Sequence, residues 1–146
     1  MNRVMQWLFV AGLLVAAAPL ASAGKLTIRN GSGSTIGSVD DNGTIRNASG
    51  SSIGRYDGGS VRDGSGSSIG RIDSDGTVRN GSGSTIGRLD KDGTLRNASG
   101  STIGRLDGCT VRNGSGSTVG RFDDCSTSDR PLMTAYLFFF TALHQR

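Results

Sequence analysis

GTLRNASGSTIGRLD, residues 93–107, is one of six versions of a unit that makes up most of the chain. Each unit has an apolar residue before Arg-Asn or Arg-Asp, and a second one before Gly-Arg or Gly-Ser, always eight residues later. From each unit to the next, the gap between these apolar positions is nine, eight, nine, nine and eight residues. The repeat of about 16–17 residues therefore varies in length at only one of its two turns.

Each unit predicts two short β-strands. In Thr44-Ile45-Arg46-Asn47, polar and apolar residues alternate, as in a half-buried strand. In Ser52-Ile53-Gly54-Arg55-Tyr56 the apolar residues are three apart, which would place them on opposite faces of a regular strand. We expect a bulge at Gly54 that turns both toward one core. The chain has no Glu, and helix formers are scarce in the repeats, so we predict an all-β fold.

The predicted core has three apolar residues per unit, which is too few for one hairpin to be stable alone. The units must therefore bury their apolar faces against one another, as in other repeat proteins. On this basis we expect four residues to be buried, namely Ile45, Ile53, Ile86 and Leu89. We expect three others to be exposed, namely Arg46, Thr85 and Asp92.

Two kinds of turn join the strands. Asn-Gly/Ala-Ser-Gly-Ser keeps one length, whereas the turn that begins at Asp is either short or longer. Insertions are tolerated at exposed tips, so we expect the Asp turn at the outer tip and the invariant turn where the geometry is tight, near the axis or next to a neighbour. The hairpins would then straddle the visible units. The leading strand (residues 25–30) would pair with the trailing one (residues 117–125) and close a ring.

The chain divides into three segments. Residues 1–23 hold Arg3, an apolar run and Ala21-Ser22-Ala23, which predicts a secretory signal peptide. Residues 24–125 hold the six repeats, and residues 126–146 a polar linker and an apolar segment. Cys109 and Cys125 bracket the sixth unit, and in an exported chain such a pair predicts a disulfide.

The apolar tail runs from Leu132 to Leu143 (LMTAYLFFFTAL). Its twelve residues are too few for a membrane-spanning helix, which needs about 20. We favour a plug that fills the ring or a cap that covers one face of it. The alternative is a segment that binds a partner or touches a membrane.

The repeated GTIRN-x-SGSTIGR-x-D units and the aromatic end, Tyr136-Leu137-Phe138-Phe139-Phe140, resemble the bacterial five-fold beta-flower repeat proteins. The resemblance covers nearly all of the chain after residue 23. It implies a ring of β-hairpins in a secreted or surface protein and supplies no catalytic residues. Two features depart from the family pattern. The repeat has six copies, which leaves five-fold or six-fold closure open, and the cysteine pair is not part of the motif.

Charged residues recur in every repeat. Closing the ring would also make a ring of the second arginine of each unit, and these are candidates for a ligand rim: Arg55, Arg71, Arg88, Arg105 and Arg121. Solvated pairs with the neighbouring aspartates are the simpler interpretation, and binding of an acidic glycan is the alternative. The net charge of +4 is interleaved with acids, which disfavours a nucleic-acid partner.

Three Asp-rich turns resemble fragments of calcium loops, beginning at Asp40, Asp73 and Asp90. Each offers only two or three oxygens, and calcium takes six to eight, so turn chemistry explains them better. The Asn-x-Ser triplets match glycosylation acceptors but also suit turns. His144 is the one histidine, and no residue set predicts a catalytic site or a cofactor.

We therefore expect a non-enzymatic, exported module with a structural or surface-interaction role. It would be secreted, periplasmic or at the surface of a bacterial cell, and a cell-surface glycan or protein would be its partner. One alternative is a glycan- or calcium-binding module. The other is a protein that acts on a membrane or partner through the tail.

Overall fold

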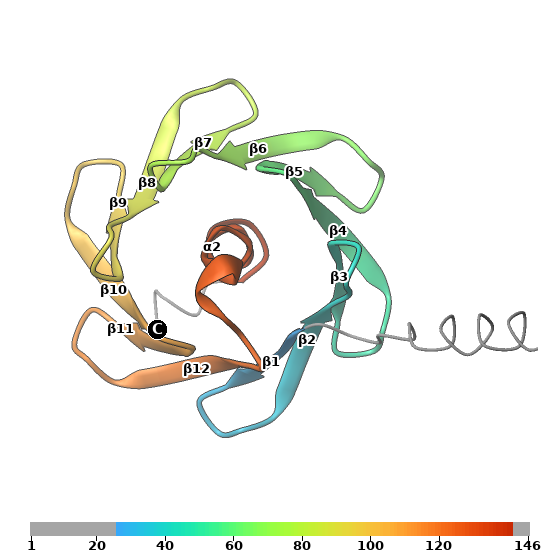
Figure 1. The fold of residues 1–146 in the computed structure, drawn as a ribbon, viewed down its shortest axis with the longest axis horizontal. Helices are drawn as coiled ribbons and strands as arrows, with labels where there is room; N and C mark the ends of the chain where they lie inside the picture. Colours follow the sequence, from blue (N-terminus) through green and yellow to red (C-terminus); the bar gives the residue numbers. More distant parts are fainter. Residues whose placement is uncertain (1–25, 142–146) are drawn as a thin grey trace, which may run out of the picture.

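The computed structural model describes residues 26–141, which form twelve antiparallel strands in one closed ring and a helix inside it (Figure 1). The strands are β1 (Leu26–Asn30), β2 (Thr35–Val39), β3 (Thr44–Asn47), β4 (Ser52–Asp57), β5 (Ser60–Asp63), β6 (Ser68–Ile72), β7 (Thr77–Asn80), β8 (Thr85–Leu89), β9 (Thr94–Asn97), β10 (Thr102–Asp107), β11 (Thr110–Asn113) and β12 (Thr118–Asp123). A short 3-10 helix, η3 (Thr127–Asp129), and α2 (Arg130–Phe139) follow. The expected signal peptide and His144 lie outside the described residues.

The ring closes through its first and last strands. Consecutive strands pair along the chain, and β1 pairs with β12 from Thr27↔Asp123 to Asn30↔Gly120. The predicted pairing of the leading and trailing strands is confirmed, as is the all-β ring of hairpin repeats. Twelve strands make six hairpins, so the closure over residues 26–141 is six-fold. The closed sheet leaves no free strand edge for another chain to pair with.

The expected positions of the two turns are wrong. We call the turns of constant length petal turns; they begin at Asn30, Asn47, Asp63, Asn80, Asn97 and Asn113. Figure 1 shows that these turns, such as the one between β1 and β2, point outward from the ring. A Cβ built on Gly33 in a petal turn would meet nothing within 4 Å. A Cβ on Gly43, in the turn between β2 and β3, would overlap the Tyr56 carbonyl.

Hydrogen bonds explain why the exposed turn is the one of constant length. In the first petal turn the Gly33 N–H donates to the Asn30 carbonyl (3.0 Å) and the Asn30 N–H to the Ser34 carbonyl (2.9 Å). Its length is therefore fixed by its own bonds. We call the turns that begin at Asp inner turns. The carbonyl of the last residue of each inner turn accepts a hydrogen bond from a backbone N–H of the next hairpin. Gly43 accepts such a bond in a longer turn, and Gly59 accepts one in a short turn. A residue inserted earlier in the turn leaves that contact in place.

A bulge occurs in each hairpin with a petal turn. The pairing of β3 with β4 shifts register between Ile45↔Gly54 and Arg46↔Ser52, so that Ile53 is the extra residue. The bulge turns Gly54 to the inner face, and Ile53 is only partly buried. The predicted bulge is confirmed, but the prediction that Ile53 and Ile86 are buried is wrong, since both lie half-buried at the edge of the core.

Of the other burial predictions, four are correct and one is wrong. Ile45 and Leu89 are buried, at 0% and 6% exposed, and Thr85 and Asp92 are exposed, as predicted. Arg46 is half-buried rather than exposed because its guanidinium donates to Asp40 and to the Gly50 carbonyl.

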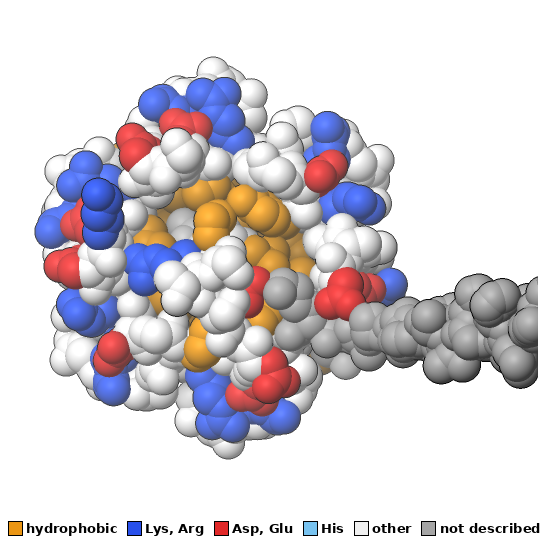
Figure 2. Space-filling model, in the orientation of Figure 1, with side chains coloured by type: hydrophobic (Ala, Val, Ile, Leu, Met, Phe, Trp, Pro, Cys, Tyr) orange, Lys and Arg blue, Asp and Glu red, His pale blue; other side chains and the backbone are white. Residues whose placement is uncertain are grey.

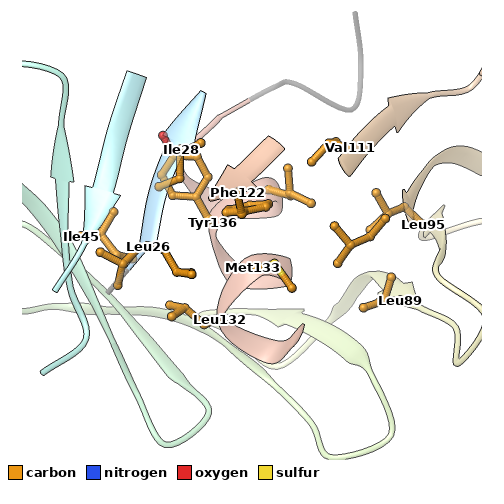
Figure 3. Packing of buried hydrophobic residues seen from close by; sticks show 13 residues of the cluster. Leu26, Ile28, Ile45, Leu89, Leu95, Val111, Phe122, Leu132, Met133 and Tyr136 are labelled. Atoms are coloured by element: carbon orange, nitrogen blue, oxygen red, sulfur yellow. The ribbon is translucent and has the colours of Figure 1, made fainter. Parts of the chain in front are cut away.

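The apolar tail fills the ring. Helix α2 runs through its centre (Figure 1) and buries Leu132, Met133, Thr134, Ala135, Tyr136 and Leu137. Figure 3 shows Leu132, Met133 and Tyr136 pointing at core residues from strands on both sides of the helix. Pro131 suits the first turn of a helix, where its missing N–H is not needed. The expectation of a plug is met by this helix, and residues 142–146 lie outside the described part of the chain.

The glycine of the Gly-Arg or Gly-Ser step makes room for this helix. A Cβ added at four of these glycines would overlap an aromatic side chain of the tail and a backbone carbonyl of the neighbouring strand. The pairs are Gly37 with Tyr136, Gly54 with Phe140, Gly70 with Phe139 and Gly87 with Phe138. The consecutive residues Phe138, Phe139 and Phe140 thus each contact a different hairpin. The repeat and the tail are complementary parts of one core.

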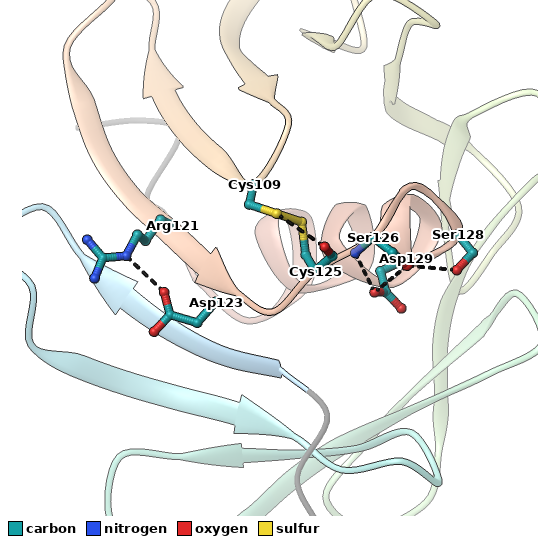
Figure 4. Close-up of a disulfide and its surroundings, with 7 residues drawn as sticks. All are labelled: Cys109, Arg121, Asp123, Cys125, Ser126, Ser128 and Asp129. Atoms are coloured by element: carbon teal, nitrogen blue, oxygen red, sulfur yellow. Dashed lines mark hydrogen bonds and ion pairs between the residues drawn. A yellow bond between two sulfur atoms is a disulfide. The ribbon is translucent and has the colours of Figure 1, made fainter.

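The predicted disulfide between Cys109 and Cys125 is present, with the two Cα atoms 5.9 Å apart. Cys109 lies in the inner turn between β10 and β11, and Cys125 lies where the chain leaves β12 (Figure 4). Asp129 then accepts hydrogen bonds from the backbone N–H and the hydroxyl of Ser126, and η3 leads the chain into α2. The disulfide therefore fixes the point at which the tail turns into the ring.

Candidate functional site

Two rows of arginines face outward around the ring. The first-row arginines follow the apolar residue of the Arg-Asn or Arg-Asp step: Arg29, Arg46, Arg62, Arg79, Arg96 and Arg112. The second-row arginines are the predicted rim residues Arg55, Arg71, Arg88, Arg105 and Arg121. Each flanks an inward-facing core residue, so strand alternation turns it to the outer face. Figure 2 shows basic and acidic side chains next to each other on the outer parts of the ring.

Strand register places one arginine of each row directly opposite the other. The pairs are Arg55↔Arg62, Arg71↔Arg79, Arg88↔Arg96, Arg105↔Arg112 and Arg29↔Arg121. Like charges directly opposite each other destabilise a sheet. The second-row arginines are therefore not brought together in one pocket; each forms a separate site with a first-row arginine.

Three of these pairs hold a carboxylate between them. Asp73 accepts from Arg71 Nε through Oδ1 (2.9 Å) and from Arg79 Nε through Oδ2 (2.8 Å). Asp90 joins its two arginines at 2.7 and 2.6 Å, and Asp123 joins its pair at 2.9 and 2.6 Å. Figure 4 shows the bond between Arg121 and Asp123. The carboxylate replaces repulsion between two cations by two charge-assisted hydrogen bonds.

These contacts also act on the acids. Arg79 and then Arg71 hold the pKa of Asp73 below its usual value. The pKa of Asp90 is lowered mainly by Arg96, and that of Asp123 mainly by Arg29. All three carboxylates are therefore held in the ionised form.

Two pairs lack this bridge, and both lie beside short inner turns. In β4 and β5 the strand pairing continues through Asp57↔Ser60, and in β10 and β11 through Asp107↔Thr110. Within the described residues the Arg55 side chain makes no hydrogen bond or ion pair, and the Arg62 side chain donates only to the Gly66 carbonyl (3.1 Å). At the other short turn Asp107 Oδ2 lies 3.6 Å from Arg112 Nε. The length of the inner turn thus correlates with whether its Asp bridges the two arginines.

The first-row arginines also stabilise the petal turns. In each hairpin an Nη1 donates to the carbonyl of the petal-turn glycine, as Arg29 does to Gly33 at 3.1 Å. The Asn30 side-chain oxygen accepts from the Ser32 N–H, the Ser32 hydroxyl and the Ser34 N–H. Asp63 makes the same three bonds in the third petal turn. The Asn-x-Ser triplets are therefore turn-forming residues on exposed tips.

The oxygens of the calcium-like turns are bound by the protein itself. Asp75 Oδ1 accepts from the Thr77 N–H (3.0 Å), and Asp92 Oδ1 from the Thr94 N–H (3.0 Å). Asp73 and Asp90 are bound by arginines, as described above. No group of three potential metal-ligating side chains occurs in residues 26–141.

A groove of about 350 Å³ lies where the plug enters the ring. It is lined by the inner turns after β6 and β8 and by the start of α2. Arg130 crosses it and donates through Nη2 to the carbonyls of Asp90 (2.9 Å) and Lys91 (3.3 Å). In this groove Arg130 anchors the plug to the ring. In the described part of the chain, no helix is both long and apolar enough to cross a membrane.

Sequence reasoning identified the second-row arginines but missed their partners in the first row. The signal was present in the repeat, because a second-row arginine and the next first-row arginine lie seven or eight residues apart, on either side of one turn. Antiparallel pairing across that turn brings the two arginines opposite each other, so the pairs could have been derived from the sequence.

A family profile described as "5-fold beta-flower protein" matches residues 24–141. The match includes the repeats, the cysteine pair and most of the apolar tail. No curated protein and no solved structure gives a significant match to the chain.

Proposed function

Because the chain belongs to the 5-fold beta-flower proteins and is a small β-hairpin repeat module, we propose that it is an exported, non-catalytic protein with a structural or surface-interaction role. Export is supported by the signal-like segment at residues 1–23 and by the disulfide, a bond typical of oxidising compartments.

The observation that carries the proposal is the location of the tail. Four aromatic side chains of the tail contact glycines on the inner face of four hairpins. The apolar surface of the tail therefore forms the core of its own ring, and the outer face is left with repeated polar side chains, including the two rows of arginines. A rigid polar surface of this kind suits interaction with a partner through many similar contacts.

The outer face also supports a non-catalytic role. Its opposed charged groups lie on neighbouring strands and are spread around the circumference rather than gathered in one cleft. Catalysis needs a base, a nucleophile or an electrophile that converge on one reacting atom. Three acids of this face, Asp73, Asp90 and Asp123, each lie against two arginines that neutralise them.

Deleting residues 131–146 tests this assignment. If the tail is the core, the truncated protein should melt at a lower temperature and bind the dye ANS, because apolar strand residues become exposed. Full-length mature protein should not float with liposomes. A truncated protein that keeps its melting temperature and loses only liposome or partner binding would overturn the proposal and make the tail an interaction element.

A glycan-binding module is the second candidate, and Arg55 with Arg62 is the observation that favours it. This pair is built like its neighbours but has no carboxylate between its members. Calcium binding has less support, because the turn carboxylates that would hold the ion are already bound by arginines and backbone N–H groups.

A further inference from the structure

The pairs of opposed arginines occur in two states in this ring, with and without a carboxylate that bridges them. Between β6 and β7, and between β8 and β9, a carboxylate bridges the two opposed arginines with Nε–oxygen distances of 2.6–2.9 Å. The same bridge forms between β12 and β1, which are neighbours in the ring although they come from opposite ends of the described chain. The recurrence shows that two opposed arginines on this face form a receptor for one carboxylate, which in each bridged pair comes from the Asp two residues after the second-row arginine.

The β4–β5 hairpin has this receptor without an occupant. Arg55 and Arg62 are opposite each other in the same register as the bridged pairs. The turn beside them is short, with Gly58 and Gly59 both at positive φ, and Asp57 stays in the strand. Arg62 is exposed, whereas the other first-row arginines are half-buried. No carboxylate of the described residues offsets the repulsion between these two cations.

We propose that Arg55 and Arg62 bind a carboxylate group of an external acidic polysaccharide, such as the carboxylate of a uronic acid residue. The proposal rests on the proposed function as an exported interaction module and names its ligand class. The ligand carboxylate takes the position that Asp73 takes between Arg71 and Arg79 in the neighbouring hairpin. It accepts one hydrogen bond from each guanidinium group.

The surroundings of the pair favour a sugar over an acidic peptide. Thr44 lies opposite Arg55 on β3, and Ser68 lies opposite Arg62 on β6. Ser60 lies opposite Arg71 on the same face. These hydroxyls donate and accept hydrogen bonds, as the hydroxyls of a sugar do. The neighbouring apolar residues, Tyr56 and Val61, alternate to the inner face and offer nothing to peptide side chains.

A weaker copy of the site lies across the ring. Arg105 and Arg112 are opposed on β10 and β11, and Asp107 approaches only Arg112, at 3.6 Å. Figure 1 shows β4 and β10 on opposite sides of the ring. The two sites face away from each other, so one molecule has the geometry to hold two polysaccharide chains.

The test is a titration of the mature, disulfide-bonded protein with trigalacturonate, followed through the arginine Nε–H signals in NMR. We expect the signals of Arg55 and Arg62 to shift first. Arg55→Gln should weaken binding about tenfold, as the loss of one charge-assisted hydrogen bond predicts. Lys91→Gln is the matched control, since it removes one exposed positive charge away from the site and should change affinity little.

Two further variants exchange the occupied and unoccupied states. Replacing Asp57-Gly58-Gly59 by the four-residue turn sequence Asp-Ser-Asp-Gly of positions 73–76 should supply an internal carboxylate and abolish binding at β4–β5. Asp73→Ala should free Arg71 and Arg79 and create a new site. Because the first variant blocks and the second creates a site on the same ring, a fold defect cannot imitate both results.

Several outcomes would overturn the proposal. One is equal binding of trigalacturonate and neutral trigalactose, and another is trigalacturonate affinity unchanged by Arg55→Gln. Phosphate binding at the pair without trigalacturonate binding would identify an adventitious anion site only. Tighter binding of tri-aspartate than of trigalacturonate would identify a protein partner instead. Each of these results leaves the tail-deletion test of the proposed function unaffected.

Discussion

The ring of Phe139 lies against Gly70, at the place where a β-carbon would stand on any other residue. Gly70 is the Gly of a Ser-Ile-Gly-Arg step on β6, and Phe139 is the last residue of α2. A short motif repeated around the ring is thus explained by a segment that is not itself repeated. Glycine is retained at this step because the plug and the neighbouring strand both need the space.

Gly70→Ala should therefore lower the free energy of unfolding by about 1–3 kcal/mol, the usual cost of overpacking a core. The added Cβ would overlap the Phe139 ring and the Arg79 carbonyl. Gly64→Ala is the matched control. Its Cβ would lie 3.5 Å or more from its neighbours, and Ala48 and Ala98 already occupy the equivalent petal-turn position. Urea denaturation checks both; equal stability of the two variants would contradict the role of Gly70.

The bulge predicts a difference between two isoleucines of one repeat. Ile45 is 0% exposed, and Ile53 is half-buried at the bulge. Ile45→Ala should cost about 2–5 kcal/mol of unfolding free energy, as for other fully buried residues. Ile53→Ala should cost clearly less, because part of its surface is already in water. Denaturant melts of the two variants under the same conditions compare them directly, and a larger loss for Ile53→Ala would place it in the core after all.

Much of this fold could be predicted from the sequence. The constant spacing of Ile45 and Ile53, and of their equivalents, set the strands and required the apolar faces to meet in a closed array. The positions of the two turns could not be predicted from their lengths. Insertions are usually tolerated at exposed tips, but here the turns of variable length are the inner ones. The structure shows that Gly43 and Gly59 keep the same hydrogen bond to the next hairpin in turns of both lengths.

The candidate site was predicted less completely. The Arg-x-Asp spacing of Arg71 and Asp73 is local and visible, but that of Arg55 and Asp57 is the same. Only the turn that follows distinguishes them, since the longer turn lets its Asp reach both arginines. Whether the Asp bridges two arginines depends on how the next strand pairs in three dimensions. The sequence pattern of one strand does not contain that information.

The disulfide should be formed in native material and should stabilise the fold. It closes a loop between residues 16 apart in sequence, for which a chain-entropy model gives about 3 kcal/mol. Alkylation without reductant followed by intact-mass measurement should show no modified thiol. The variant Cys109→Ser/Cys125→Ser should melt at a lower temperature than the wild type. Two alkylated thiols in native protein would contradict the assignment.

Acid should weaken the ring through its arginine-bridged aspartates. The pKa of Asp73, Asp90 and Asp123 is lower in the folded protein than in the unfolded chain, because arginines stabilise each carboxylate. A lowered folded pKa means that the contribution to stability is present above the unfolded pKa of about 3.9 and is lost as pH falls through the folded pKa. We therefore expect the melting temperature to be steady near neutral pH and to fall below about pH 4.

Asp73→Asn separates this effect from general acid denaturation. The variant should be less stable than the wild type at pH 7 and should differ from it less at low pH, because protonation removes the same charge from Asp73. Asp57→Asn is the matched control, since Asp57 forms no ion pair among the described residues, and the variant should be about as stable as the wild type at pH 7. Melting curves between pH 2 and pH 7 measure both differences. If the two variants lose equal stability at pH 7, the bridge between Arg71 and Arg79 contributes nothing, and the carboxylate receptor on the outer face loses its support.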